Sequence, residues 1–460
     1  MKRKNLQLII NLLILLILTT SILVSCNSTQ TKQDEKVEFQ KVKHPEWSKN
    51  LSIYEVNIRQ YSEEGTFNAF AEQLPRLKEL GTDILWLMPI HSIGEKNRKG
   101  TLGSYYAVKD YYGINPEFGT EEDFRSLINK AHELGMYVII DWVANHSAWD
   151  NELINEHPDW YSKNEEGEII SPVPDWTDVA DFNYDVPEMR QYMTDALKYW
   201  VKEFNIDGYR CDVAGMVPVD FWNNVRYELD KIKPVFMLAE ANEPELQEYA
   251  FDMTYGWNMH FLWNEIAQGK KTVNDLAQLF ETEKTKYNSN DYRMYFTSNH
   301  DENTWKGTAI ERLGDALKAF TVLSATAPAM PLIYSGQEAC LNKQLNFFEK
   351  DPINWETDCD LDKLYQAILN LKKENQALWN GDFGGSMKRI TTTADDKIFA
   401  FERKKDESTV ITILNLSPDE IEFELSDSIE GDNLTELFTK EALSNSFKLN
   451  AWGYKVYRTK

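Results

Sequence analysis

Three apolar runs of this sequence end in a carboxylate. The runs are GYRCD at 208–212, FMLAE at 236–240 and MYFTSNHD at 294–301, and they place Asp212, Glu240 and Asp301 at strand-like ends. Burying an unpaired ion is strongly unfavourable unless a site uses it. Carboxylates that converge in one cleft can serve as nucleophile, general acid and general base. We therefore take these three residues as candidate catalytic residues.

The neighbours of these carboxylates predict different roles for them. Arg210 and Asp212 are two residues apart, so on a strand they share a face, and an adjacent cation favours the ionised carboxylate. Glu240 lacks such a partner in the sequence, and we expect its pKa to be raised, with Asp301 helping to keep it protonated. This division predicts Asp212 as nucleophile and Glu240 as general acid, the pair that performs retaining glycoside hydrolysis when the two carboxyl groups lie about 5 to 5.5 Å apart. A purely structural Arg210–Asp212 salt bridge is the alternative.

The elements that position these residues alternate between strand-like and helix-like patterns. Helical patterns cover 67–80, 121–134, 187–204, 219–231, 311–324 and 361–374. Eight strand-like runs occur at LSIYEVNI 51–58, DILWLM 83–88, MYVIID 136–141, GYRCD 208–212, VFMLAE 235–240, FDMTY 251–255, MYFTS 294–298 and PLIYS 331–335. Continuous apolar strands alternating with helices predict a parallel (β/α)8 TIM barrel, whose active site lies at the carboxyl ends of the strands.

The chain is too long for one compact core of about 250 to 300 residues, so we expect more than one domain. The alternation predicts a catalytic barrel over residues 46–375. Between about 145 and 186 it fails, and we expect a short inserted domain after the third strand. From 376 to 460 the pattern is strand-like, which predicts a C-terminal all-β sandwich domain.

The N-terminus has the features of a secretory signal. Lys2, Arg3 and Lys4 precede an apolar run, and the sequence LVSC at 23–26 resembles a bacterial lipobox. We expect a lipoprotein signal peptide at 1–25, lipid attachment at Cys26 and a polar tether at 26–45. This predicts an extracytoplasmic protein anchored by lipid to a bacterial membrane, at the periplasmic face or the cell surface, and touching the membrane only through that anchor. A plain cleaved signal or an uncleaved anchor is the alternative.

Charge and cysteine content exclude other classes. The formal net charge is −25, with 74 Asp and Glu against 49 Lys and Arg, so nucleic acid is not an expected partner. After cleavage only Cys211, Cys340 and Cys359 remain, which is no disulfide framework, although one bridge between Cys340 and Cys359 stays open. Cys211 alternates with Arg210 and Asp212 on its strand and is expected to be a packed, inert thiol.

Several motifs together resemble the α-amylase family, glycoside hydrolase family 13. They are DWVANH at 141–146, GYRCD at 208–212, the Glu of FMLAE at 236–240 and SNHD at 298–301, in the family's order. The likeness extends to GSYYAVKDYYGINPEFGT at 103–120, VADFNYDVPEMR at 179–190 and IYSGQE at 333–338, so it covers about residues 50–375. The resemblance also implies the C-terminal β-domain.

The resemblance implies roles at matching positions. Asp212 would be the nucleophile, Glu240 the acid and base, and Asp301 a third carboxylate that grips sugar hydroxyls. His146 and His300 would donate hydrogen bonds to the same sugar ring and Tyr106 would stack beneath it. No cofactor is required and no metal ligand is assigned, although Asn145 matches a family calcium ligand and leaves a structural calcium ion open.

Other positions weaken or extend this likeness. Gly215 and Met216 stand where many relatives have Lys and His, so the preference on the acceptor side is not fixed. Some loop tryptophans could act as sugar platforms, with core packing as the alternative; these are Trp142, Trp149, Trp160, Trp176 and Trp305.

The function expected from these observations is retaining hydrolysis of α-1,4-glucosidic bonds in starch or maltodextrins, with an α-glucan or malto-oligosaccharide as substrate. Two alternatives remain. One is an oligosaccharide-specific relative, such as a cyclomaltodextrinase, α-glucosidase or transglycosylase. The other is a non-catalytic glucan-binding lipoprotein, whose relatives typically lack one or more of the three carboxylates. The sequence does not fix the oligomeric state.

Overall fold

The structure is a computed structural model that describes residues 38–426, 429 and 433–459. The expected signal peptide, Cys26 and most of the expected tether lie outside the described residues. The end of the expected tether contacts the barrel, because Val42 donates to the carbonyl of Glu248 and His44 contacts Asp252 at 2.8 Å. Among the described residues, no helix is long and apolar enough to cross a membrane.

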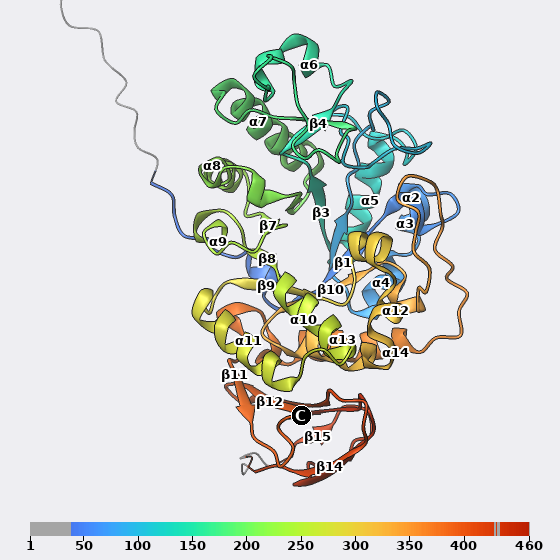
Figure 1. Ribbon diagram of the computed structural model, residues 1–460, viewed down its shortest axis with the longest axis vertical. Helices are drawn as coiled ribbons and strands as arrows, with labels where there is room; N and C mark the ends of the chain where they lie inside the picture. The colour runs from blue at the N-terminus through green and yellow to red at the C-terminus, as the bar shows by residue number, and fades with distance from the viewer. Residues whose placement is uncertain (1–37, 427–428, 430–432, 460) are drawn as a thin grey trace, which may run out of the picture. The chain divides into compact units, whose positions relative to one another are not determined.

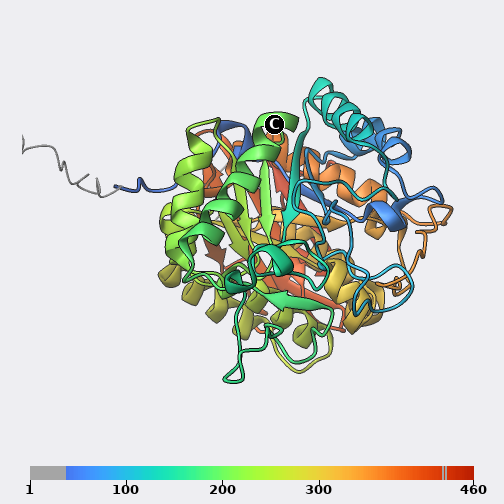
Figure 2. The same cartoon turned by 90° about the horizontal axis from the view of Figure 1, so that it is seen from above.

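Eight parallel strands close into a barrel, which confirms the expected fold class (Figures 1 and 2). Neighbouring strands follow the order β1-β10-β9-β8-β7-β6-β3-β2. The strands are β1 (Ile53–Val56), β2 (Ile84–Leu87), β3 (Tyr137–Trp142), β6 (Gly208–Cys211), β7 (Phe236–Ala239), β8 (Met253–Tyr255), β9 (Tyr292–Phe296) and β10 (Met330–Tyr334).

The barrel strands are apolar on both faces, and successive residues of a strand pack in two different buried clusters. On β1, Ile53 packs in a cluster with Trp86, Leu238 and other strand residues, whereas Tyr54 belongs to the larger cluster that includes the helices. Because successive side chains point to opposite faces of a strand, this alternation places one cluster inside the barrel and the other beneath the helical layer. Burial on both faces explains why these strands read as continuous apolar runs.

Helices surround the barrel strands (Figure 1). The α-helices are α2 (Ile58–Tyr61), α3 (Phe67–Ala71), α4 (Leu74–Leu80), α5 (Glu121–Glu133), α7 (Pro187–Phe204), α8 (Val219–Asp230), α9 (Leu246–Tyr249), α10 (Trp257–Ala267), α11 (Val273–Lys286), α12 (Ala309–Leu313), α13 (Leu317–Thr326) and α14 (Leu361–Glu374). Short turns of helix add η1 (Glu46–Asn50), η3 (Ala214–Met216), η4 (Glu302–Lys306), η5 (Gly314–Ala316), η6 (Gln337–Ala339), η7 (Gln376–Leu378) and η8 (Gly381–Phe383).

Local signals explain where several helices begin and end. Thr120 and Asp123 form a capping box at the start of α5. Pro187 stands in the first turn of α7, and Asn205 follows that helix with a left-handed φ of 58°. Two predicted helices are each interrupted: 67–80 is divided into α3 and α4, and 311–324 into α12 and α13 around Gly314 with φ of 52°. Helices α10 and α11 were not predicted.

The insert after β3 contains little regular structure. Strands β4 (His146–Ala148) and β5 (Val179–Asp181) pair antiparallel, and α6 (Leu153–Glu156) and η2 (Pro158–Trp160) lie between them in the chain. This pairing brings the two ends of the insert together at β3. His146 is therefore fixed at the point where the chain leaves the barrel.

The C-terminal strands form two antiparallel sheets. The larger sheet has the order β11-β12-β13-β17-β15, and β14 pairs with β16. Apolar side chains of both sheets share one buried cluster, which includes Ile411, Phe423 and Leu449. The strands are β11 (Met387–Ile390), β12 (Ile398–Lys405), β13 (Ser408–Asn415), β14 (Ile421–Glu424), β15 (Thr435–Glu436), β16 (Ser446–Leu449) and β17 (Tyr454–Arg458).

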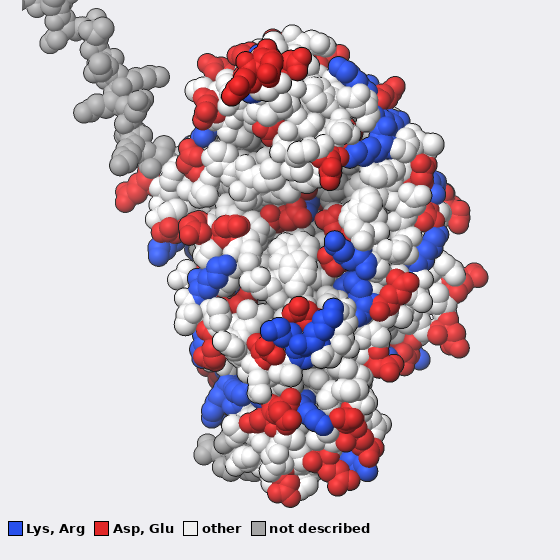
Figure 3. Space-filling view, viewed as in Figure 1, with Lys and Arg blue, Asp and Glu red and all other residues white. Residues whose placement is uncertain are grey.

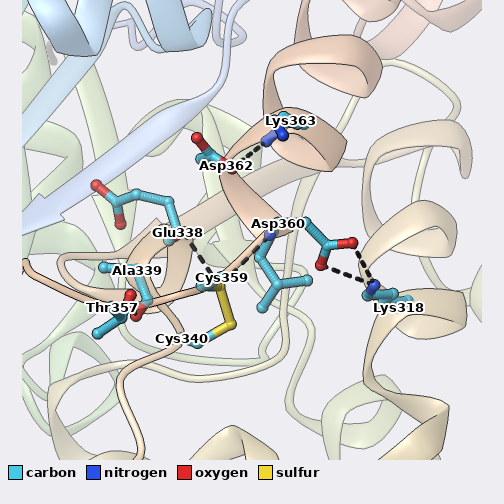
Figure 4. The surroundings of a disulfide bond; sticks show 10 residues. Lys318, Glu338, Ala339, Cys340, Thr357, Cys359, Asp360, Asp362 and Lys363 are labelled. Carbon is cyan, nitrogen blue, oxygen red and sulfur yellow. Dashed lines mark hydrogen bonds and ion pairs between the residues drawn. A yellow bond between two sulfur atoms is a disulfide. The ribbon is translucent and has the colours of Figure 1, made fainter.

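Cys340 and Cys359 form a disulfide, so the bridge that the sequence left open is present (Figure 4). Their Cα atoms are 5.9 Å apart. The bond joins the turn after β10 to the start of α14 and closes the loop between them. Cys211 is a buried free cysteine, as expected, and burial raises the pKa of its thiol well above the usual value.

Candidate active site

The predicted site residues meet around one cavity at the carboxyl ends of the barrel strands. The cavity has a volume of about 200 Å³. Its lining includes Asp212, Glu240, Asp301, Tyr106, His146 and His300. A larger cavity of about 550 Å³ lies between α11 and the β11–β12 strands, but it contains none of these residues. The convergent carboxylates therefore identify the smaller cavity as the candidate active site.

Arg210 lies beneath the cavity and connects its carboxylates. Its side chain is 0% exposed. Nη1 donates to both carboxylate oxygens of Asp141 at 2.8 and 2.9 Å and to Oδ1 of Asp212 at 3.1 Å. Nη2 lies 2.8 Å from Oε2 of Glu240 as an ion pair, although its N–H groups are not aimed along a hydrogen bond. One guanidinium thus contacts three carboxylates.

This arrangement corrects the expectation that Glu240 lacks a cationic partner. β6 and β7 are hydrogen-bonded neighbours, so the arginine on β6 reaches the residue that follows β7 as well as Asp212. Burial raises the pKa of Asp212 and of Glu240, while Arg210 acts against that rise in both. The arginine alone therefore does not assign the proton to one of them.

The hydrogen bonds of Glu240 leave one of its oxygens toward the cavity. Oε2 accepts a hydrogen bond from the backbone N–H of Val213 at 2.8 Å. Val213 has a left-handed φ of 36°, an unfavourable conformation for a β-branched residue, and such strain collects at functional sites. Among the described residues, Oε1 of Glu240 has no hydrogen-bond partner, so a proton on Oε1 could be given to a ligand in the cavity.

His300 is held between two carboxylates and Tyr106. Nδ1 contacts Glu55 of β1, and Nε2 lies 2.8 Å from the hydroxyl of Tyr106 and 3.4 Å from Asp301. Burial alone would lower the pKa of His300, but Asp301 and Glu55 outweigh it and raise this pKa to about 9. The imidazole is therefore a cation at neutral pH, and its Nε2–H donates to the hydroxyl of Tyr106, which in turn donates to Asp141.

Tyr106 and His146 border the same space. The hydroxyl of Tyr106 donates to Asp141 at 3.0 Å, and its ring lies nearly parallel to that of His300 with centroids 5.5 Å apart. Burial lowers the pKa of His146 to about 3, so this histidine is neutral. Trp176 of the insert lies against it at 5.5 Å between ring centroids. One histidine of the cavity is therefore charged and the other is not.

Two of the five candidate tryptophans line the cavity, namely Trp176 and Trp305. Trp305 is 52% exposed and its Nε1 donates to Oδ1 of Asp301 at 3.2 Å. Trp142 and Trp160 are buried in the core, and Trp149 donates to the carbonyl of Thr177. Phe347 and Phe348, which sequence reasoning missed, add further aromatic rings to the lining.

The described residues do not fit the calcium site that the family resemblance left open. The amide nitrogen of Asn145, not its oxygen, faces Oδ1 of Asp181 at 3.4 Å. Asp178 is paired with Lys99 at 3.1 Å, and the carbonyl of Asp175 accepts from the same ammonium at 2.7 Å. In the part of the chain that the structure describes, no group of three or more His, Cys, Asp or Glu could hold a metal ion. The Lys99 ammonium, which contacts Asp178 and the carbonyl of Asp175, repels a divalent cation at these oxygens.

Sequence reasoning also missed Asp141 and Glu55, which are both fully buried beneath the site. Asp141 could have been found, because MYVIID at 136–141 is a fourth apolar run that ends in a carboxylate. Glu55 is the single acidic residue inside the β1 run, and its inward direction follows from register that the sequence does not show.

The chain matches family models over most of its length. Residues 35–178 and 173–378 match the family described as "Alpha amylase, catalytic domain", and residues 389–456 match "Maltogenic Amylase, C-terminal domain". The chain belongs to the α-amylase family, glycoside hydrolase family 13. As a member of this family it is a glycoside hydrolase.

Two solved structures and one further relative agree with this assignment. An alpha-amylase from Lactobacillus plantarum is 31% identical with a TM-score of 0.81, and the match covers 90% of this chain and 100% of that one. A "noncanonic maltogenic alpha-amylase" from Thermotoga neapolitana is 30% identical with a TM-score of 0.79, covering 89% and 96%. A cyclomaltodextrinase from Thermoanaerobacter pseudethanolicus is 24% identical over 423 residues, covering 81% of this chain and 71% of the relative. This family member is thus similar both to amylases and to enzymes named for cyclic dextrins.

Proposed function

We propose that this enzyme hydrolyses α-1,4-glucosidic bonds of malto-oligosaccharides and maltodextrins with retention of anomeric configuration. The observation that carries the proposal is the pair Asp212 and Glu240, which follow adjacent strands, border one cavity and contact the same guanidinium of Arg210. Two carboxyl groups on one site are the machinery of retaining hydrolysis.

In the first step, Asp212 attacks the anomeric carbon while Glu240 gives its proton to the glycosidic oxygen. The bond to the leaving sugar breaks, and a covalent glycosyl-Asp212 ester forms. Burial raises the pKa of Asp212 as well as that of Glu240, so the support for Glu240 as the acid is its position: its Oε1 has no hydrogen-bond partner among the described residues and can give a proton to the glycosidic oxygen. The hydrogen bond from Arg210 to Oδ1 of Asp212 supports the anionic form of the nucleophile.

In the second step, Glu240 acts as base toward a water molecule, which attacks the anomeric carbon and releases Asp212. Positive charge develops on the sugar ring in both transition states. Asp301 and Asp212 border the space for that ring, and His300 and His146 lie where its hydroxyl groups would be. Tyr106 offers a ring face beneath the sugar.

Replacing Asp212 by Ala tests the nucleophile. We expect a loss of kcat of about 10⁴-fold or more, because no other carboxylate can form the ester. Asp220→Ala on exposed α8 is the matched control and should retain activity. Thermal unfolding shows whether both variants fold. Activity of Asp212→Ala near that of the wild-type enzyme would refute the assignment, and β-anomeric products from the wild type would refute retention.

A second candidate function is endo-acting hydrolysis of starch, which the similarity to an alpha-amylase favours. The similarity to a cyclomaltodextrinase favours a specialist for small substrates. Comparing rates on soluble starch, maltotriose and cyclodextrin separates these functions. Release of internal fragments from starch is the outcome that favours the endo-acting enzyme.

We further propose that the enzyme is a lipoprotein attached through Cys26 to the outer surface of a bacterial membrane. The support is the sequence alone: a basic start, an apolar run and LVSC at 23–26. Labelled palmitate should enter the wild-type protein expressed in bacteria and not the Cys26→Ala variant. Equal labelling of both proteins would contradict the anchor.

A further inference from the structure

One side of the active-site cavity is bordered by Lys99 of the segment 94–103, which follows β2 and which we call the crossbar. On one flank the crossbar contacts the insert. Nζ of Lys99 donates to the carbonyl of Asp175 at 2.7 Å and pairs with Oδ1 of Asp178 at 3.1 Å. Lys99 and Asp178 both line the cavity, so this ion pair forms part of its wall.

On the other flank the crossbar contacts the loop that the Cys340–Cys359 disulfide closes. The backbone N–H of Thr101 donates to Oε1 of Glu349 at 2.9 Å, and the N–H of Leu102 donates to the carbonyl of Phe348 at 3.0 Å. The packing between them is tight: a Cβ added at Gly100, which has φ of +63°, would lie 2.4 Å from Cβ of Phe348. The crossbar therefore leaves no open path between itself and this loop.

Buried and half-buried arginines hold the crossbar in place. Arg59, which is 2% exposed, donates to the carbonyls of Gly103 at 3.2 Å and Leu102 at 3.3 Å. Arg98 donates from Nε to the carbonyl of Gly94 at 2.8 Å. Hydrogen bonds to a charged group are among the stronger ones, so this segment is a fixed wall.

The position of the general acid gives the cleft a direction. Glu240 must lie on the side of the departing sugar, because it protonates the glycosidic oxygen. Glu240 follows β7, whereas the crossbar follows β2, and three strand positions separate these two strands around the eight-stranded barrel. The crossbar is thus on the glycone side, where the non-reducing end of the substrate lies.

Beyond Asp212, on the aglycone side, two apolar side chains are exposed. Met216, on η3, is 47% exposed, and Val219 at the start of α8 is 38% exposed. The crossbar on the glycone side and these exposed side chains on the aglycone side both belong to this chain's own loops.

We infer that the crossbar ends the glycone side of the cleft, so that the enzyme removes short oligosaccharides from the non-reducing end and does not cut long chains internally. This inference rests on the proposed α-1,4-glucan hydrolysis.

The experiment compares two maltoheptaosides, one with a free non-reducing end and one whose non-reducing end is blocked by an ethylidene group, and follows loss of substrate and the size of the products by chromatography. We expect the wild-type enzyme to cleave the blocked substrate about 100-fold more slowly, because the blocked end cannot fit against the wall. Equal rates on the two substrates would overturn the inference. Cleavage of neither would instead contradict the proposed hydrolysis, and the inference with it.

Variants connect this result to the crossbar. Lys99→Ala combined with Glu349→Ala removes one contact on each flank, and we expect it to raise the ratio of blocked to free cleavage by about tenfold. Lys96→Ala is the matched control within the crossbar: the Lys96 ammonium lies 5.8 Å from the Trp149 ring and does not line the cavity. An unchanged ratio in the double variant, with folding confirmed by circular dichroism, would show that the crossbar does not set the preference.

Discussion

Among the carboxylates around Arg210, Asp141 accepts the most hydrogen bonds from its guanidinium. It accepts two hydrogen bonds from Nη1, and further ones from Trp86 Nε1 at 3.1 Å and from Tyr106. In Asp141→Asn the shape persists but the charge is lost, so Arg210 should turn toward Asp212 and Glu240 and lower the pKa of both. We predict a fall in kcat of about 10² to 10³-fold, since Glu240 would then lose its proton at neutral pH. The pH profile of kcat should shift to lower pH.

The control for this prediction is Asp83, which is also buried but lies at the start of β2. It pairs with Lys78 and Lys373 at 2.7 Å each. Breaking a buried ion pair typically costs about 3 to 5 kcal/mol, so Asp83→Asn should lower stability as much as Asp141→Asn does. If both variants lose stability but kcat falls equally in both, the role of Asp141 is structural.

His300 predicts a dependence of stability on pH. Its pKa is about 9 in the folded protein against an ordinary value of 6.5, so the folded state binds this proton more tightly. The resulting stabilisation is fully present below pH 6.5 and is lost as pH rises through 9. A shift of this size corresponds to about 3 kcal/mol. Urea unfolding at several pH values should show this loss in the wild type and not in His300→Gln. The same dependence of the free energy of unfolding on pH in both proteins would contradict the assignment.

At the scale of elements, the loop that the disulfide closes carries part of the site. Residues between Cys340 and Cys359 include Phe347 and Phe348, which line the cavity. Closing a loop of this length stabilises a protein by about 3 kcal/mol through the unfolded state. We predict that Cys340→Ser with Cys359→Ser lowers stability by about this amount and raises KM more than it lowers kcat, because substrate contacts loosen while Asp212 and Glu240 remain in place.

A reducing agent provides the control for the disulfide prediction. The wild-type enzyme in dithiothreitol should approach the stability and KM of the double serine variant, and that variant should not respond to the reagent. A wild-type KM that is unchanged after complete reduction, measured by thiol titration, would contradict the role of the bond.

The elements themselves could be predicted because each follows local rules. All eight barrel strands overlap the predicted runs, although β3, β9 and β10 each extend one or two residues beyond them, and parallel topology alone then brought Asp212, Glu240 and Asp301 to one rim. The pKa shifts of Glu240 and His300 could not be predicted, because they depend on contacts between different strands. Arg210 of β6 contacts Glu240 after β7, and Glu55 of β1 contacts His300 after β9. The crossbar was also beyond reach, since Thr101 and Glu349 are 248 residues apart in the chain.

At the scale of the whole molecule, the net charge of −25 acts chiefly against anionic partners. The face drawn in Figure 3 carries acidic and basic side chains intermixed. A neutral glucan substrate is compatible with such a surface.

The barrel and the C-terminal sheets are joined through buried contacts, which predicts how the molecule unfolds. Arg403 of β12 is 1% exposed and donates to the carbonyls of Ala327 after α13, Trp379 and Gly385. Phe399 of the same strand stacks on Phe280 of α11 with ring centroids 5.6 Å apart. Because these contacts couple the two parts, we predict one calorimetric unfolding transition for the wild-type protein.

Removing the guanidinium should break this coupling. Arg403→Met removes the donor to the carbonyls of Trp379 and Gly385, at about 1 to 3 kcal/mol each, and both lie in the segment 377–385 between the barrel and the sheets. We expect two separate transitions in this variant. Arg389→Met is the matched control, because Arg389 of β11 donates to Ile398 and Ala400 within the same sheet and should lower stability without dividing the transition. One transition in Arg403→Met, at a lower temperature, would mean that apolar contacts such as Phe280–Phe399 suffice to couple barrel and sheets.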